Sequence, residues 1–227
     1  MKIRKSLLYL FWLSLPFNLY GQDWPNFNRY RQDNYRVGMP AENENRIVFM
    51  GNSITEGWSV TYPEFFNGKP YINRGISGQT TPQMLVRFRA DVIDLKPKAV
   101  VILAGTNDIA GNTGPSTVKM IADNIFSMAE LAKEHNISVI ISSVLPVYKY
   151  SWIEEDLDPV PIISRLNAII KNYALKNGHI YLDYYSEMVD ERMGLMEEYT
   201  PDGVHANKAG YKVMSALAEK AIMKALK

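Results

Sequence analysis

The sequence predicts one three-layer α/β domain, in which helices cover both faces of a parallel sheet of about five strands. The chain has 227 residues, of which 47% are hydrophobic and 22% charged, and this is enough for one sizeable core. Short apolar runs rich in β-branched residues alternate with longer stretches of helical periodicity. Such alternation is typical of parallel strands that are buried on both faces and joined by helices.

The N-terminal 21 residues have the pattern of a secretory signal peptide and are set apart from the fold. A basic start precedes the apolar run 7–15 and then a proline; the basic residues are Lys2, Arg4 and Lys5. The run is shorter than the roughly 20 residues that cross a bilayer as a helix. We therefore expect cleavage after Gly21, export to the periplasm or medium, and no stable membrane insertion of the mature domain, residues 22–227.

The elements of the mature domain follow in a regular order. Residues 22–45 are polar and aromatic, and we expect them to form an irregular N-terminal segment on the outside of the sheet. The β-branched runs predict strands at 46–50, 70–73, 99–104, 137–144 and 179–183. Helical spacing predicts helices at 82–95, 116–134, 161–176 and 208–227. The flavodoxin-like doubly wound fold has this number of parallel strands, five, with helices between them.

Composition excludes several classes of function. The chain has no cysteine, which excludes disulfides, thiolate metal sites and thiol nucleophiles. Without the signal peptide, 22 basic residues stand against 24 acidic ones, so the charge gives no case for nucleic acid. The acidic residues between 154 and 158 have no histidine beside them, and we expect a solvated face there and no metal site.

Polar residues that are able to support catalysis follow the strands, at the edge where parallel sheets bind ligands. Ser53 follows the first strand, Gly75 the second and Asn107 the third, while Asp202 and His205 come well after the fifth. Each has a structural alternative: a capping serine, a turn glycine, a turn asparagine, and a cap with a surface histidine. The other two histidines, at positions 135 and 179, have structural interpretations, which leaves one well-placed base.

Taken together, these residues supply the groups that serine acyl transfer requires. Ser53 is the alcohol, His205 accepts its proton, and Asp202 orients the imidazole. The backbone N–H groups of Ser53 and Gly75 and the side-chain amide of Asn107 would form the oxyanion hole. Ser77 is the rival nucleophile on this edge.

The ordered blocks resemble the SGNH, or GDSL-like, hydrolase and esterase family. The blocks are Gly51-Asn52-Ser53, Gly75, Gly105-Thr106-Asn107-Asp108 and Asp202-Gly203-Val204-His205, and the resemblance spans residues 47 to the C-terminus. The first block has Asn where the family commonly has Asp, as in the branch resembling platelet-activating-factor acetylhydrolases and carbohydrate acetylesterases. The resemblance implies a flavodoxin-like fold and ester hydrolysis without metal or other cofactor.

The substrate is less well defined by the sequence. Trp58 and the aromatic pair Tyr148 and Trp152 are candidates for a rim that stacks on sugar rings, although packing within the domain explains them equally well. We expect a small-molecule or carbohydrate ester, most simply an O-acetyl ester, with a lipid ester or lysophospholipid as the enzymatic alternative. An FMN-binding electron carrier and a sugar-binding protein without catalysis are the non-enzymatic alternatives. The sequence does not define an oligomeric state.

Overall fold

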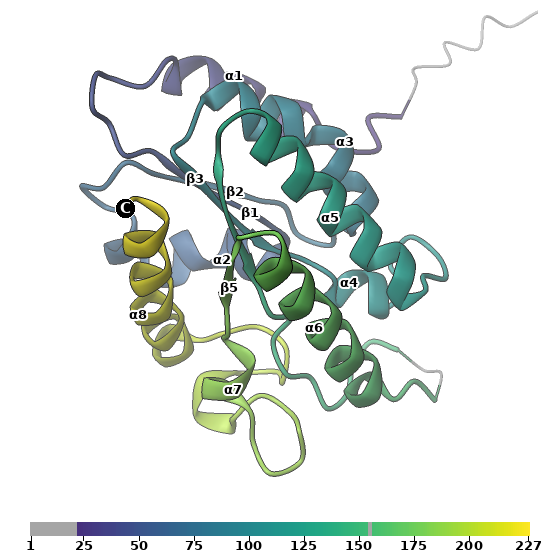
Figure 1. The fold of residues 1–227 in the computed structure, drawn as a ribbon. Coiled ribbons are helices and arrows are strands. Elements are labelled where there is room, and N and C mark those ends of the chain that lie inside the picture. Colours follow the sequence, from purple (N-terminus) through teal and green to yellow (C-terminus); the bar gives the residue numbers. More distant parts are fainter. Residues whose placement is uncertain (1–21, 154–155) are drawn as a thin grey trace, which may run out of the picture.

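The computed structural model describes residues 22–153 and 156–227, so the predicted signal peptide lies outside the described residues. Five strands form one parallel sheet in the order β2-β1-β3-β4-β5 (Figure 1). Their bounds are β1 (Ile47–Gly51), β2 (Tyr71–Gly75), β3 (Ala99–Leu103), β4 (Ser138–Ser142) and β5 (Ile180–Leu182). This order is the doubly wound, flavodoxin-like one, and it confirms the predicted fold class.

Helices cover the two faces of this sheet. Helices α3 (Thr81–Asp91), α5 (Val118–Glu134) and α6 (Pro159–Lys176) pack on one face, and α2 (Ser53–Thr61) and α8 (Lys208–Ala225) on the other (Figure 1). Two single-turn helices, α4 (Thr106–Ile109) and α7 (Tyr185–Met188), follow β3 and β5. Each predicted long helix is present, with ends shifted by a few residues.

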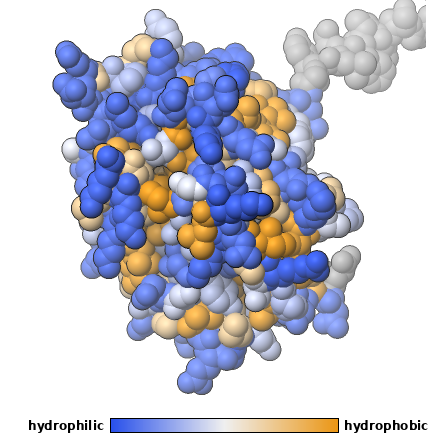
Figure 2. Space-filling view, viewed as in Figure 1, coloured by the Kyte–Doolittle hydropathy of each residue, from blue (hydrophilic) through white to orange (hydrophobic). Residues whose placement is uncertain are grey.

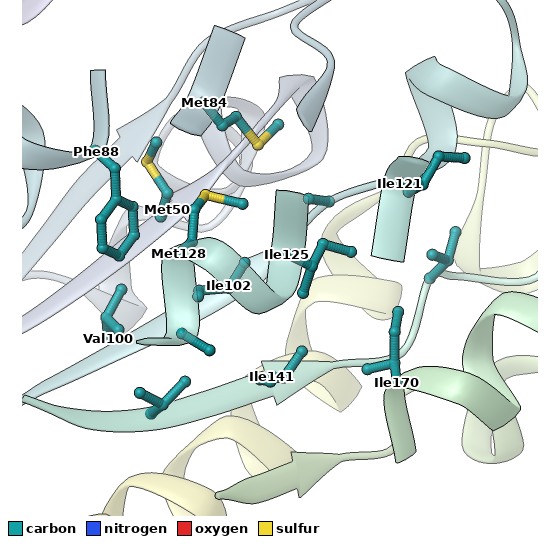
Figure 3. Close-up of a cluster of buried hydrophobic side chains, with 14 of the residues drawn as sticks. Met50, Met84, Phe88, Val100, Ile102, Ile121, Ile125, Met128, Ile141 and Ile170 are labelled. Atoms are coloured by element: carbon teal, nitrogen blue, oxygen red, sulfur yellow. The ribbon is translucent and has the colours of Figure 1, made fainter. Parts of the chain in front are cut away.

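The core consists of two apolar layers because successive residues of each strand face opposite sides of the sheet. Val48 and Met50 pack with α3, α5 and α6, whereas Ile47 and Phe49 pack with α2 and α8. Figure 3 shows the first layer, where Met50, Met84, Phe88 and Met128 meet isoleucines from the strands and helices. Burial on both faces explains the largely apolar composition of the strands.

The N-terminal segment differs from the prediction of irregular structure, because residues 28–37 form helix α1 (Asn28–Val37). Asp23 accepts hydrogen bonds from the N–H groups of Phe27 and Asn28, which lie at the start of the helix. Tyr30 is its one buried residue, so the helix lacks the apolar stripe that sequence analysis relies on. Contacts to other elements stabilise α1, and the hydrophobic periodicity of the sequence does not reveal such contacts.

The surface is mixed in character. Figure 2 shows a mainly hydrophilic face with hydrophobic patches between the charged groups. Within the described residues, no helix is both long and apolar enough to span a bilayer. In the same part of the chain, no three His, Asp or Glu side chains gather in a way suited to holding a metal ion.

Candidate active site

The sharp turn after β1 places Ser53 at the start of helix α2. Asn52 caps this helix, since its side-chain oxygen accepts the N–H of Ile54 at 3.0 Å. Gly51 is needed at the turn because a Cβ there would lie 2.0 Å from Thr55 Oγ1. Ser53 is half-buried and is the first helical residue, so its own N–H has no acceptor within the helix.

The structure brings together the three residues of the predicted relay. Ser53 Oγ lies 2.9 Å from His205 Nε2, and His205 Nδ1 lies 2.7 Å from Asp202 Oδ2. The other carboxylate oxygen of Asp202 accepts the N–H groups of Val204 and His205, which fixes the turn. Burial raises the pKa of Asp202, but these hydrogen bonds outweigh it and the net pKa is lowered. Asp202 is therefore a carboxylate at neutral pH, able to orient and stabilise the imidazole.

Helix α8 holds the loop of His205 against helix α2, which carries Ser53. Tyr211, on α8, donates its hydroxyl hydrogen to the carbonyl of Ile54, directly after Ser53, at 2.8 Å. Trp58 stacks between Tyr211 and Phe65 and donates its ring N–H to Ser215. Only 1% of Trp58 is exposed, because its position on α2 faces the sheet. The prediction that Trp58 lines the substrate crevice is therefore wrong, and its role is structural.

Gly75, the last residue of β2, is not placed to donate its N–H to an oxyanion, so this part of the prediction is wrong. The N–H of Gly75 donates to the side-chain oxygen of Asn73 at 2.9 Å, and the residue is buried. A Cβ at Gly75 would lie 2.1 Å from the backbone nitrogen of Glu56, so Gly75 serves close packing against α2. Its amide is already used and does not point to an oxyanion hole.

Gly78, three residues further on, has the properties that Gly75 lacks. It is exposed, its φ is +77°, and a Cβ would meet no atom within 4 Å. Within the described part of the chain its N–H has no hydrogen-bond acceptor. The two glycines lie three apart in the segment Gly75-Ile76-Ser77-Gly78, and sequence alone does not show which amide is free.

Asn107 lies in helix α4 at the end of β3, where Gly105 takes a φ of +118°. Its side-chain nitrogen donates to the carbonyl of Gln79 at 2.9 Å, next to Gly78. The neighbouring Asp108 accepts hydrogen bonds from the N–H and hydroxyl of Thr81, at the start of α3. Asn107 is thus held beside the loop that carries Gly78, and among the described residues the second hydrogen of its –NH₂ group has no acceptor.

The remaining polar candidates of this edge have structural partners. Ser77 Oγ donates to the carboxylate of Glu56 at 2.6 Å and, within residues 22–153 and 156–227, has no hydrogen bond to an imidazole, which argues against it as nucleophile. Asp183 accepts the N–H and the hydroxyl of Ser186 and so caps helix α7. These contacts leave Ser53, Asp202 and His205 as the relay.

The two exposed aromatic candidates lie on the connection between β4 and α6. Tyr148 is 55% exposed and lies under the guanidinium of Arg192, and Trp152 is 47% exposed. Trp152 lines a cavity of about 630 Å³ together with Asp108 and Ile109 of helix α4, which also carries Asn107. Their exposure is compatible with a substrate rim, which stays a prediction.

Comparison with known proteins places this fold in a family of hydrolases. Residues 49–213 match the GDSL-like Lipase/Acylhydrolase family, and the chain belongs to that family. A solved structure of a GDSL-like lipase from Bacteroides thetaiotaomicron is 49% identical, with a TM-score of 0.88, over 90% of this chain and 100% of that one. Membership confirms the resemblance seen in the sequence.

Two curated relatives are more distant. The acetylxylan esterase of Xylanibacter ruminicola is 24% identical over 222 residues, which cover 82% of this chain and 45% of that protein. The lipoprotein YqeF of Bacillus subtilis, described as uncharacterized, is 30% identical over 118 residues, 44% of this chain and 49% of that protein. The chain thus spans just under half the length of each.

Proposed function

We propose that the chain is an exported serine esterase that removes short acyl groups, most simply O-acetyl groups, from carbohydrate through an acyl-enzyme on Ser53. The observation that carries the proposal is the continuous relay of Ser53 Oγ, His205 and Asp202, with contacts of 2.9 Å and 2.7 Å. An alcohol, an imidazole and a carboxylate in that order are the groups that serine acyl transfer uses.

The reaction follows from this geometry. Ser53 Oγ attacks the ester carbonyl as His205 Nε2 takes its proton, and Asp202 stabilises the imidazolium. His205 then returns the proton to the leaving alcohol, which departs as the acyl-enzyme forms. Water enters, His205 takes a proton from it, and the same steps release the acid and free Ser53.

The oxyanion of each tetrahedral intermediate needs donors directed at it. We assign these donors to the N–H groups of Ser53 and Gly78 and the side-chain amide of Asn107. Gly78 replaces Gly75, whose amide is bonded to Asn73. Such donors act most strongly when negative charge develops on the oxygen, and each is worth roughly 3 kcal/mol in comparable sites.

Two relatives support different substrates. The acetylxylan esterase of Xylanibacter ruminicola supports an acetyl group on a sugar, and the exposed Tyr148 and Trp152 provide aromatic surfaces on which a sugar ring stacks. The GDSL-like lipase of Bacteroides thetaiotaomicron supports the alternative, a lipid ester. A flavin-binding function would leave the relay without a role.

A substrate panel tests the proposal. Purified protein is assayed with p-nitrophenyl esters from acetate to octanoate and with acetylated xylo-oligosaccharides, alongside Ser53→Ala and Ser59→Ala as a matched control on the same helix. We expect acetyl esters to have the highest kcat/KM, with activity lost in Ser53→Ala and kept in Ser59→Ala. A preference for octanoate would favour the lipid substrate, and full activity in Ser53→Ala would overturn the mechanism.

Export and domain limits are part of the same proposal. We propose that residues 1–21 are removed and that 22–227 form the single catalytic domain; the lipoprotein relative is compatible with export. Cell fractionation followed by N-terminal sequencing tests this, with Gln22 expected at or within a few residues of the mature N-terminus. An uncleaved chain in the cytoplasm would contradict it.

A further inference from the structure

We propose that helix α1, which lies outside the family-matched region, positions the oxyanion side of the active site through Arg29, Glu56 and Ser77. The inference rests on the proposed function and deepens it. It concerns positioning residues, because none of the three is placed to touch the reacting atoms. The family match begins at residue 49, whereas α1 spans Asn28–Val37.

The central contact is the carboxylate of Glu56, one turn after Ser53 on helix α2. One oxygen accepts both the N–H and the hydroxyl of Ser77, at 2.8 Å and 2.6 Å. The other oxygen accepts the guanidinium of Arg29, on α1, at 2.8 Å. A single carboxylate therefore joins the nucleophile helix, the residue before Gly78, and the N-terminal helix.

Further contacts tie the same loop to the N-terminal segment. The hydroxyl of Tyr30 donates to the carbonyl of Gly75. The side-chain amide of Gln79 donates to the carbonyl of Pro25 at 2.8 Å. Residues 75, 77 and 79 are thus each held, directly or through Glu56, by the N-terminal segment. Gly78 lies between two of them.

Gly78 depends on these neighbours for its position. Gly78 has no side chain that could hold it, and its φ of +77° is a conformation that glycine adopts easily. Its N–H has no acceptor within the described residues. The carbonyl of Gln79, next in sequence, also holds the side-chain amide of Asn107. A shift of this loop would therefore move two of the three assigned donors together.

The Glu56 contacts are better suited to positioning than to stability. The Arg29 and Glu56 side chains are 48% and 25% exposed, and ion pairs this open to solvent contribute little to folding. Charge-assisted hydrogen bonds to an ionised carboxylate are short and directional, so they fix the two atoms of Ser77 well. Burial raises the pKa of Glu56, but the hydrogen bonds from Ser77 and Arg29 outweigh burial, so the net pKa is lowered and the carboxylate stays ionised at neutral pH.

Substitutions of the bridge test the proposal. Glu56→Gln and Arg29→Met are compared with Arg31→Met, an exposed arginine on the same helix for which the structure shows no side-chain hydrogen bond among the described residues. We expect Glu56→Gln to lower kcat for p-nitrophenyl acetate roughly ten- to hundredfold with KM within about twofold, since small misplacements cost rates of this order. Arg29→Met should lose less, and Arg31→Met should match wild type.

A second measurement separates positioning from general damage. A trifluoromethyl ketone forms a tetrahedral oxyanion with the nucleophile, so its inhibition constant should rise in step with the loss of kcat/KM. Tyr30→Phe supplies a further variant if Glu56→Gln does not fold. The inference would be overturned if the variants kept wild-type kcat, if their loss were confined to KM, or if a lower Tm explained it. In each of these cases the wild type would still be active, so the proposed function would stand. A wild-type chain without esterase activity would overturn the proposed function and this inference with it.

Discussion

Replacing Asp202 by Asn changes the hydrogen-bonding character of the group that faces the imidazole of His205. One oxygen of Asp202 accepts two backbone N–H groups at 2.9 Å and 2.8 Å, so the amide oxygen of Asn should remain there. The –NH₂ group would then face His205 Nδ1, which lies 2.7 Å from the present carboxylate. This favours the tautomer with hydrogen on Nε2, which is unable to accept the proton of Ser53.

The same exchange in a serine protease lowers kcat about 10⁴-fold, and we take this as the upper bound. The side chains of His205 and Asp202 are 36% and 39% exposed, so water competes for Nδ1 and softens the penalty. We expect a loss of about 10³-fold, or ~4 kcal/mol of transition-state stabilisation, with a Tm close to wild type.

The assay is kcat/KM for p-nitrophenyl acetate, with Asp183→Asn as the matched control. Asp183 accepts the N–H and hydroxyl of Ser186 in α7, and the part of the chain that the structure describes shows no hydrogen bond from it to the imidazole, so its variant should lose little activity. If Asp183→Asn were the more damaging in kcat at unchanged thermal stability, or if Asp202→Asn stayed within about threefold of wild type, the role given to Asp202 would be wrong.

Three further predictions concern the residues around the relay. Asn107→Ala should lower kcat by about 10²- to 10³-fold with a smaller change in KM, and a change confined to KM in steady-state kinetics would contradict an oxyanion role. Gly75→Ala would place a Cβ 2.1 Å from the backbone nitrogen of Glu56, so Tm should fall by several degrees; a normal Tm with a reduced kcat would return the oxyanion role to Gly75. Burial raises the pKa of Asp108 to about 6, so the folded state holds a proton that the unfolded state releases, and stability should fall by about 2 kcal/mol as pH rises from about 4.5 to 7.5. Urea unfolding at several pH values should show this fall in stability with rising pH in wild type but not in Asp108→Asn. An equal pH dependence in the two proteins would refute the role given to Asp108.

The sheet was predictable from sequence because its strands are buried on both faces. Burial demands apolar, β-branched runs, and Ala99–Leu103 shows such a run without interruption. The order of the strands follows from the doubly wound topology once five are counted. The predicted strand ends differ from the observed ones by at most two residues, because turns and capping decide where a strand stops.

Helix α1 was missed because its stability comes from tertiary hydrogen bonds. Its sequence, Asn28–Val37, is polar, and one buried residue does not make an apolar stripe. Trp58 was misplaced for a related reason, since its face of α2 becomes apparent only when that helix packs on the sheet beside Tyr211.

The relay was easier to predict than the oxyanion hole. Asp202 and His205 are three residues apart in one turn, and the sequence offers one well-placed histidine for Ser53. Two of the three proposed oxyanion donors are backbone amides, and any residue but proline carries one. Whether Gly75 or Gly78 has a free N–H depends on the side chain of Asn73, which only the structure reveals.

The central claim is that Ser53 carries the acyl group during turnover. Intact-mass spectrometry with peptide mapping, after brief reaction with p-nitrophenyl acetate or a fluorophosphonate, tests it most directly. We predict a single adduct on the peptide that contains Ser53 in wild type and none in Ser53→Ala. An adduct on Ser77 or another residue, or rapid turnover by the Ser53→Ala protein, would contradict the account.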